Sequence, residues 1–227
     1  MLGSIAEGRS DVNGFLAGED CLSTLQAMRL MGVVIEQASA TQLTIQGVGL
    51  HGLAAPASAL DLGNSGTAIR LMTGLLSGQG FDSVLTGDHS LSGRPMGRII
   101  KPLALMGARI ESSDGKPPLR VFGVEELEGI DYDMPVASAQ VKSSVLLAGL
   151  YATGNTSVTE PAVTRDHTER MLRAMGADVS TEGHRISIAG GQRLKACHVD
   201  VPADLSSAAF VILAAILSEA ADVLVTN

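Results

Sequence analysis

The phrase "LALMGARI" at residues 103–110 decides how this chain is organised, because nearly the same phrase occurs twice more. The other copies are "MRLMGVVI" at residues 28–35 and "LRAMGADV" at residues 172–179. In each copy an apolar, helix-like segment ends at a glycine, and strand-forming residues follow. A glycine just past the last helical residue can take the left-handed conformation that other residues resist. Each copy therefore predicts a helix end, a glycine turn and then a strand.

A second phrase recurs with nearly the same period as these glycines. The glycines, 75 and 69 residues apart, are Gly32, Gly107 and Gly176. The second phrase predicts a helix end, a short polar turn and a strand, and it reads "SIAEGRSDVNGF", "LLSGQGFDSVLTG", "LYATGNTSVTEP" and "AILSEAADVLVTN". Its aligned valines, 72, 74 and 65 residues apart, are Val12, Val84, Val158 and Val223. Helix–glycine–strand alone is common in α/β proteins, but two phrases with one period of about 70 residues indicate an internal repeat.

The repeat predicts a single α/β domain over residues 1–227, made of three units at approximately 9–83, 84–157 and 158–222. Each unit reads as strand, helix, strand, strand and helix. Alternating strand candidates follow the glycine phrase each time, and they are "QLTIQG", "LRVFG" and "RISIAG". Because the helix stripes are nearly all aliphatic, we expect the helices inside and the sheets outside. The chain opens in a helix with no strand before it, so we expect one domain of a longer chain.

Composition narrows the class of protein. Apolar residues make up 45% of the chain and charged residues 18%, which is typical of a soluble globular protein. A formal net charge of −8 argues against a nucleic-acid partner, and no apolar run reaches the roughly 18 residues that span a membrane. Cys21 and Cys197 fit no metal spacing and read as reduced thiols, and the five histidines are scattered. We therefore predict a cytoplasmic protein with no metal, cofactor, nucleic-acid partner or membrane partner.

Two predicted helix starts carry features that suit an anion. In "LGNSGTAIR", Asn64 or Ser65 can cap the helix, and Gly66 lets a ligand approach the backbone amides. The alternative for this motif is a plain cap and a tight turn. In "LTGDHSLSGRPMGRII", Arg94 lies at the mouth of a helix, where a cation is unfavourable unless an anion is near. The alternative there is a solvated arginine.

Three later helix starts are also rich in polar groups. "VASAQVKSSVLLAGLYATG" places hydroxyl, amide and ammonium donors, including Lys142, in the first turns of a helix. "VTRDHTERML" predicts a capping box between Asp166 and Glu169, with Arg165 free to face a cleft and His167 facing solvent. "VPADLSSAAFVILAA" predicts a buried helix that Asp204 caps.

The motifs "GNSGTAIR", "LTGDHSLSGRPM", "SAQVKSSVLLAGL", "EPAVTRDHTERML" and "DLSSAAFVI" occur in this order along the whole chain. Together they resemble the 5-enolpyruvylshikimate-3-phosphate synthase family, the glyphosate-inhibited transferases of the shikimate pathway to chorismate and the aromatic amino acids. The resemblance implies one half of a fold with two similar inside-out α/β domains, each of three βαβαββ units, and an active site between them. The UDP-N-acetylglucosamine enolpyruvyl transferase family shares the threefold repeat and stays an alternative. That family usually has a cysteine-bearing loop where this chain reads "TGDHSLSGRPM".

The resemblance also implies roles for residues at the first two helix starts. Gly66 is similar to the glycine that lines the family's phosphoenolpyruvate pocket, and Asn64 lies beside it. Arg94 is similar to the arginine that holds the anionic groups of phosphoenolpyruvate.

At the next two helix starts the implied ligand is shikimate 3-phosphate. Ser138, Ala139 and Gln140 match its contacts, and Gln140 is expected to reach both substrates. The family often has a second serine where this chain has Ala139, so a contact there has to use the backbone. Arg165 resembles a phosphate-binding arginine of one subclass. No metal and no cofactor are implied.

The chain departs from the family pattern in two ways. A Lys-Ser-x-Ser-x-Arg segment would precede residue 1, and the second domain, with the acidic proton-transfer residue and a Lys–Glu pair, is absent from the 227 residues. The resemblance thus assigns no catalytic residue here, and we expect weak binding of shikimate 3-phosphate without turnover. An active half that needs the second domain as its partner, and a non-catalytic binding module, stay as alternatives.

Overall fold

In a computed structural model that describes residues 1–225, the three recurring glycines all take the left-handed conformation. Their φ angles are +88° for Gly32, +95° for Gly107 and +86° for Gly176. The helices that end just before them are α2 (Glu19–Leu30), α5 (Gly97–Leu105) and α7 (His167–Ala174). Each glycine N–H donates to the carbonyl three residues earlier, and the next N–H donates to the carbonyl five residues earlier. This is the bonding pattern of a Schellman motif, and it confirms the predicted helix ends.

A buried methionine before each glycine ties the turn to the rest of its unit. The methionine carbonyls accept N–H groups from distant segments, in the pairs Met31 with Ala54 (2.9 Å), Met106 with Glu128 (2.9 Å) and Met175 with Lys195 (2.8 Å). The same long-range bond therefore recurs in all three units. The unit boundaries at 9–83, 84–157 and 158–222 stay a prediction.

Three four-stranded sheets share one strand order. In each sheet the first two strands are parallel, and the third is antiparallel to both of its neighbours. One sheet consists of β4 (Leu60–Asp61), β5 (Ser83–Thr86), β7 (Lys116–Val121) and β6 (Ile110–Ser113). The next consists of β9 (Asp131–Asp133), β11 (Asn155–Thr159), β13 (Arg185–Ala189) and β12 (Val179–Glu182). The third joins both ends of the body through β14 (His198–Asp200), β1 (Glu7–Asn13), β3 (Gln42–Val48) and β2 (Val34–Ser39).

The predicted strands at "QLTIQG", "LRVFG" and "RISIAG" correspond to β3, β7 and β13, the third strand of each sheet. The shorter elements are a parallel pair, β8 (Leu127–Glu128) and β10 (Ala152–Thr153), and the one-turn helices α1 (Leu2–Ile5) and α4 (His89–Ser92).

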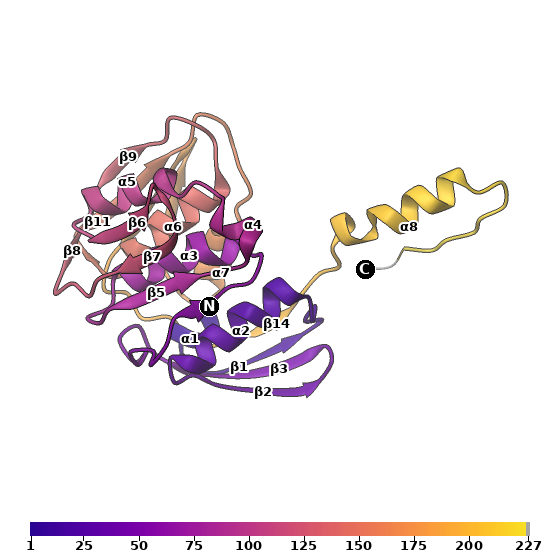
Figure 1. Ribbon diagram of the computed structural model, residues 1–227, viewed down its shortest axis with the longest axis horizontal. Coiled ribbons are helices and arrows are strands. Elements are labelled where there is room, and N and C mark those ends of the chain that lie inside the picture. Colours follow the sequence, from indigo (N-terminus) through magenta and orange to yellow (C-terminus); the bar gives the residue numbers. More distant parts are fainter. Residues whose placement is uncertain (226–227) are drawn as a thin grey trace.

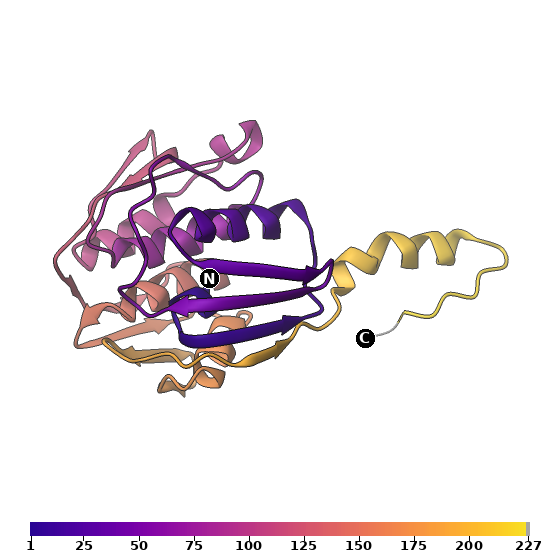
Figure 2. The same ribbon diagram turned by 90° about the horizontal axis from the view of Figure 1, so that it is seen from below.

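Two buried helices form the centre of the body. α3 (Gly66–Ser77) and α6 (Ala139–Gly149) lie side by side with the sheets around them, as Figures 1 and 2 show. Their backbones touch where Gly74 faces Ser144, and a Cβ at Gly74 would collide with the Ser144 carbonyl. Ser144 Oγ also donates to the Arg70 carbonyl at 2.9 Å. Helices inside and sheets outside are as the aliphatic stripes predicted.

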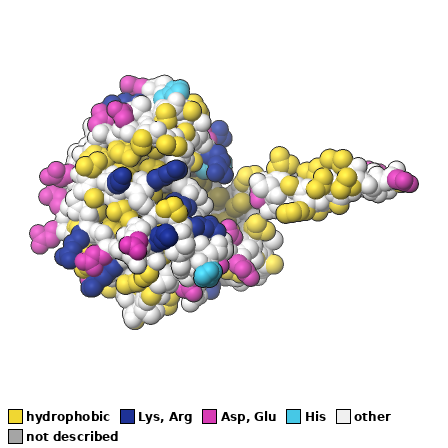
Figure 3. Space-filling model, turned by 45° about the horizontal axis from the view of Figure 1, so that its top comes forward, with side chains coloured by type: hydrophobic (Ala, Val, Ile, Leu, Met, Phe, Trp, Pro, Cys, Tyr) yellow, Lys and Arg dark blue, Asp and Glu magenta, His cyan; other side chains and the backbone are white. Residues whose placement is uncertain are grey.

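The prediction of a buried last helix is wrong for the described chain. α8 (Leu205–Leu217) is capped by Asp204 as expected, but it extends away from the body as an apolar rod (Figures 1 and 3). Phe210 is 82% exposed, and no residue of α8 is buried. An apolar helix has to pack against other apolar surfaces, but its sequence does not show whether those surfaces belong to this part of the chain. Among residues 1–225, no helix has both the length and the hydropathy to cross a membrane.

The fourth copy of the second phrase also differs from the prediction. The residues after α8, including Val223, form no strand within the described residues. Thr226 and Asn227 lie outside the described residues.

Two glycines at opposite ends of α5 give a paired test of the turn. Gly107→Ala should lower the free energy of unfolding by about 1–2 kcal/mol, because an L side chain is strained at positive φ. Gly97→Ala, where an added Cβ meets no atom within 4 Å, should be neutral or stabilising by up to about 1 kcal/mol. Denaturant unfolding of both variants measures the difference. Equal effects of the two substitutions would contradict a special conformation at Gly107.

Candidate functional site

The start of α3 organises the first part of the candidate site. Ser65 caps the helix, because its Oγ accepts the Ala68 N–H at 3.2 Å, and this settles the choice between Ser65 and Asn64. The Asn64 side chain is then available for other contacts. Its Oδ1 accepts from Arg94 Nη2 at 2.6 Å, and its Nδ2 donates to Asp88 Oδ2 at 2.8 Å. Asn64 thus holds the Arg94 guanidinium at the start of α3, whereas the sequence placed Arg94 at the mouth of the helix that follows it.

Gly66 lies under two guanidinium groups. A Cβ at this position would be 2.7 Å from Arg94 Nη1 and 2.8 Å from Arg70 Nη1, so a side chain here would displace both guanidinium groups. Arg70 Nη1 also donates to the Gly66 carbonyl at 3.0 Å. Burial, and then the nearby charges of Arg94 and Arg98, lower the pKa of Arg70. Three positively charged guanidinium groups thus lie near one another, and such a concentration of positive charge favours the binding of an anion.

Arg70 is a candidate functional residue that the predicted set of site residues did not contain. The signal was present, because Arg70 is four residues after Gly66 and therefore on the same face of the first turn of α3.

Gln140 connects the start of α6 to the start of α3. Its Oε1 accepts from Arg70 Nη1 at 3.1 Å, and its Nε2 donates to Thr67 Oγ1 at 2.7 Å. Ser138 caps α6, where its Oγ accepts the Val141 N–H at 3.4 Å. The two helix starts, at Gly66 and Ala139, therefore present their free amides at one place although 73 residues separate them in sequence.

A hollow of about 130 Å³ lies beside Gln140. Its lining residues are Thr67, Leu71, Ala139, Gln140, Ser143, Arg165, His167 and Thr168. The structure thus brings Ala139, Gln140 and Arg165 to one hollow, and it brings Asn64, Gly66 and Arg94 into contact next to it. Arg70 joins the two groups. Ser138 stands one residue before the hollow, outside its lining.

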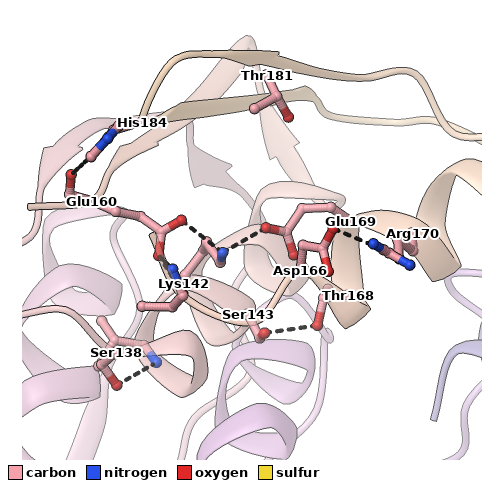
Figure 4. A network of polar contacts seen from close by, with 12 residues as sticks. Ser138, Lys142, Ser143, Glu160, Asp166, Thr168, Glu169, Arg170, Thr181 and His184 are labelled. Carbon is pink, nitrogen blue, oxygen red and sulfur yellow. Dashed lines mark hydrogen bonds and ion pairs between the residues drawn. The ribbon is translucent and has the colours of Figure 1, made fainter. Parts of the chain in front are cut away.

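Lys142 does not point to a ligand, contrary to the prediction for this helix start. Its ammonium is buried 2.8 Å from Glu160 Oε1 and 2.7 Å from Glu169 Oε1 (Figure 4). The predicted capping box is wrong for the same reason, because Glu169 turns inward to Lys142. Asp166 makes no side-chain cap either, and it accepts from Arg170 Nε at 2.8 Å instead. The buried pair with Lys142 takes Glu169 and the exposed pair with Arg170 takes Asp166, so neither half of the capping box forms.

The arrangement suits small anionic ligands. Guanidinium groups bind phosphate and carboxylate with paired hydrogen bonds, and the amides at helix starts add a favourable dipole. Arg94 and Arg70 lie over one helix start, and Arg165 faces the adjacent hollow. Two anionic groups a short distance apart would each meet a separate cation here.

Residues 1–227 match the family described as EPSP synthase (3-phosphoshikimate 1-carboxyvinyltransferase). The 3-phosphoshikimate 1-carboxyvinyltransferases of Methylococcus capsulatus and Alkalilimnicola ehrlichii are each 59% identical over 224 residues, which cover 98% of this chain and 51% and 50% of the relatives. A solved structure of EPSP synthase from Acinetobacter baumannii superposes with a TM-score of 0.90 at 61% identity, and covers 95% of this chain and 49% of that one.

The chain spans about half the length of the curated relatives it matches. These likenesses confirm the family and the fold class predicted from the sequence. The chain belongs to the EPSP synthase family.

Proposed function

We propose that the chain is one half of a 3-phosphoshikimate 1-carboxyvinyltransferase, a cytoplasmic enzyme. It would transfer the enolpyruvyl group of phosphoenolpyruvate to shikimate 3-phosphate on the way to chorismate. The names of the relatives support this activity. The observation that carries it is the convergence of Arg94 and Arg70 over Gly66, beside the hollow that Arg165 lines.

Phosphoenolpyruvate fits the cluster at the start of α3. Its phosphate and carboxylate are both anionic, and Arg94 and Arg70 offer several donors within reach of the bare Gly66 backbone. Asn64 holds Arg94 at 2.6 Å and so fixes the direction of its donors.

Shikimate 3-phosphate fits the hollow at the start of α6. Arg165 supplies the charge for the 3-phosphate, and Gln140 supplies an amide that reaches toward both substrates. Ser138 and the backbone of Ala139 supply further contacts at the same helix start. Because Gln140 bonds Arg70, the two substrates would lie against each other.

Catalysis needs groups that this half does not supply. The transfer requires an acid that protonates the methylene carbon and a base for the attacking hydroxyl. The Leu91 N–H, and then the Asn64 amide, hold the pKa of Asp88 below its usual range. Arg170 holds the pKa of Asp166 below its usual range. Both carboxylates are therefore ionised and already engaged, which makes them poor acids and weak bases.

The partner that completes the site is the second half of the same enzyme. α8 supports this partner, because a helix that is apolar on all sides belongs in a core. Its exposed side chains include Leu205, Phe210, Ile216 and Leu217. We infer that α8 packs into the second half and so carries the chain from one half to the other.

The role of Arg165 can be tested by calorimetry with shikimate 3-phosphate. Arg165→Ala should weaken binding by about 1.5–3 kcal/mol, because a charged hydrogen bond is lost. Arg109→Ala is the control with the same charge change, since Arg109 pairs with Glu111 on an exposed strand outside the site. Unchanged affinity in Arg165→Ala would contradict the assignment.

The purified chain alone should release no measurable phosphate from the two substrates. It should bind shikimate 3-phosphate no tighter than about 10⁻⁴ M, since half of the contacts are missing. Adding the second half, with the Lys-Ser-x-Ser-x-Arg segment, should restore some turnover in a phosphate-release assay. A rate near that of a full-length relative from the chain alone would overturn the proposal of a half site.

The role of α8 can be tested in the same assay. Phe210→Asp should abolish the restored turnover, because a charge cannot enter the apolar core of the second half. The thermal stability of the chain alone should not change, since Phe210 is exposed. Leu105→Asp, an equally polar change at an exposed position of α5, is the control and should leave the restored rate unchanged. Restored turnover in Phe210→Asp would mean that α8 docks elsewhere.

A further inference from the structure

A buried ionic cluster links a helix of the second unit to two segments of the third. Its members, called here the Lys142 cluster, are Lys142, Glu160 and Glu169, whose side chains are only 1%, 4% and 3% exposed. Figure 4 shows the ammonium of Lys142, from α6, between two carboxylates. One belongs to Glu160, which directly follows β11, and the other to Glu169 in α7. The proposed substrate contacts do not include any of the three.

Stability is a poor explanation for the Lys142 cluster. Burying charged groups costs several kcal/mol per ion, and apolar replacements of buried ion pairs are often neutral or stabilising. Here one ammonium faces two carboxylates, and Glu169 Oε2 is buried without a hydrogen-bond partner within the described residues. A cluster this costly calls for another role, and fixing the relative positions of its segments is one that buried ion pairs can serve.

The cluster is attached on both sides of Arg165. Glu160 Oε2 accepts the N–H of Thr164 at 3.1 Å and also its hydroxyl, and Thr164 directly precedes Arg165. Glu169 lies four residues after Arg165, in the first turn of α7. The third member, Lys142, is two residues after Gln140 in α6. Both flanks of Arg165 are therefore tied to the helix turn that carries Gln140.

The position of Arg165 depends on these flanks. Its side chain is exposed and makes no hydrogen bond or ion pair with any of residues 1–225. The position of the guanidinium group therefore depends on the backbone of the loop alone. A single neutral bond also joins α6 to α7 next to the hollow, between Ser143 Oγ and Thr168 Oγ1 at 2.7 Å. The Lys142 cluster supplies the charged links, which hold both sides of the loop.

We propose that Lys142 is a positioning residue of the shikimate 3-phosphate site. Through Glu160 and Glu169 it holds the loop of Arg165 at a fixed distance from Gln140, without touching the ligand. This inference rests on the proposed function for the identity of the ligand. Its structural part, the ordering of residues 163–168 by Lys142, can be measured without any ligand.

The test uses a variant in which no charge is left unpaired. Lys142→Met, Glu160→Gln and Glu169→Met are combined, so that the amide introduced at position 160 can still accept from Thr164 while the link to α6 is lost. The thermal stability of this triple variant should stay equal or rise. Amide hydrogen exchange over residues 163–168 should become about tenfold faster. Affinity for shikimate 3-phosphate should fall about tenfold, because the charged contact from Arg165 is misplaced.

Two control variants distinguish a loss of positioning from the effects of a changed charge and of a lower stability. Glu169→Gln keeps an acceptor for Lys142 and balances the charge, so exchange and affinity should stay within about twofold of the original chain. Leu119→Ala, a cavity in the buried face of β7, lowers stability at a distance and should leave exchange over 163–168 and affinity unchanged.

The outcomes are distinguishable. If the triple variant folds with unchanged exchange over residues 163–168, or with unchanged affinity, the positioning role is wrong. If the triple variant does not fold, Lys142→Met alone is compared with Leu119→Ala at equal stability loss, and equal exchange and affinity in the two overturn the proposal. If the unmodified chain does not bind shikimate 3-phosphate at any concentration, the proposed function fails, and the exchange measurement still decides the role of Lys142.

Discussion

The backbone contact between α3 and α6 is the interaction on which the site depends. Gly74 and Ser144 let two buried helices approach until their main chains touch, and Ser144 Oγ bonds the Arg70 carbonyl across the contact. Because both helices then run from one end of the body, their first turns lie together. At this separation Gln140 reaches both Arg70 and Thr67 of α3. A side chain at Gly74 would therefore push α3 and α6 apart and so change the site, which lies two helical turns away.

Repulsion between cations at the site opposes the stability of the folded protein. Arg70, Arg94 and Arg98 lie near one another, and burial deprives Arg70 of water. The nearby carboxylate Asp88 is held by Asn64 and by the start of α4. A bound dianion would relieve this repulsion, so ligand binding and folding are coupled here, as they are wherever a ligand binds only the native state.

The sequence predicted what depends on local rules and missed what depends on distant partners. The turn at Gly107 was predictable because helix ends at positive φ require glycine whatever surrounds them. The choice between Asn64 and Ser65 was open, since either can cap, and Arg94 decides it by engaging Asn64. Lys142 and Glu169 were given wrong roles, because spacing along the chain does not reveal an ion pair between two helices.

The third sheet has a consequence for how the chain is made. Asn13 Nδ2 bonds Asp200 Oδ1 across 187 residues, and β1 pairs with β14 alongside β3 and β2. During synthesis the sheets that contain β5 and β11 can form while the chain is still growing. The edge of β1 that pairs with β14 stays unpaired until β14 has been synthesised. Such an edge is a template for mispairing with other nascent chains. Asp11 and Arg9, exposed on β1 and paired at 2.9 Å, place charge on this strand, and charged side chains on an unpaired strand disfavour such mispairing.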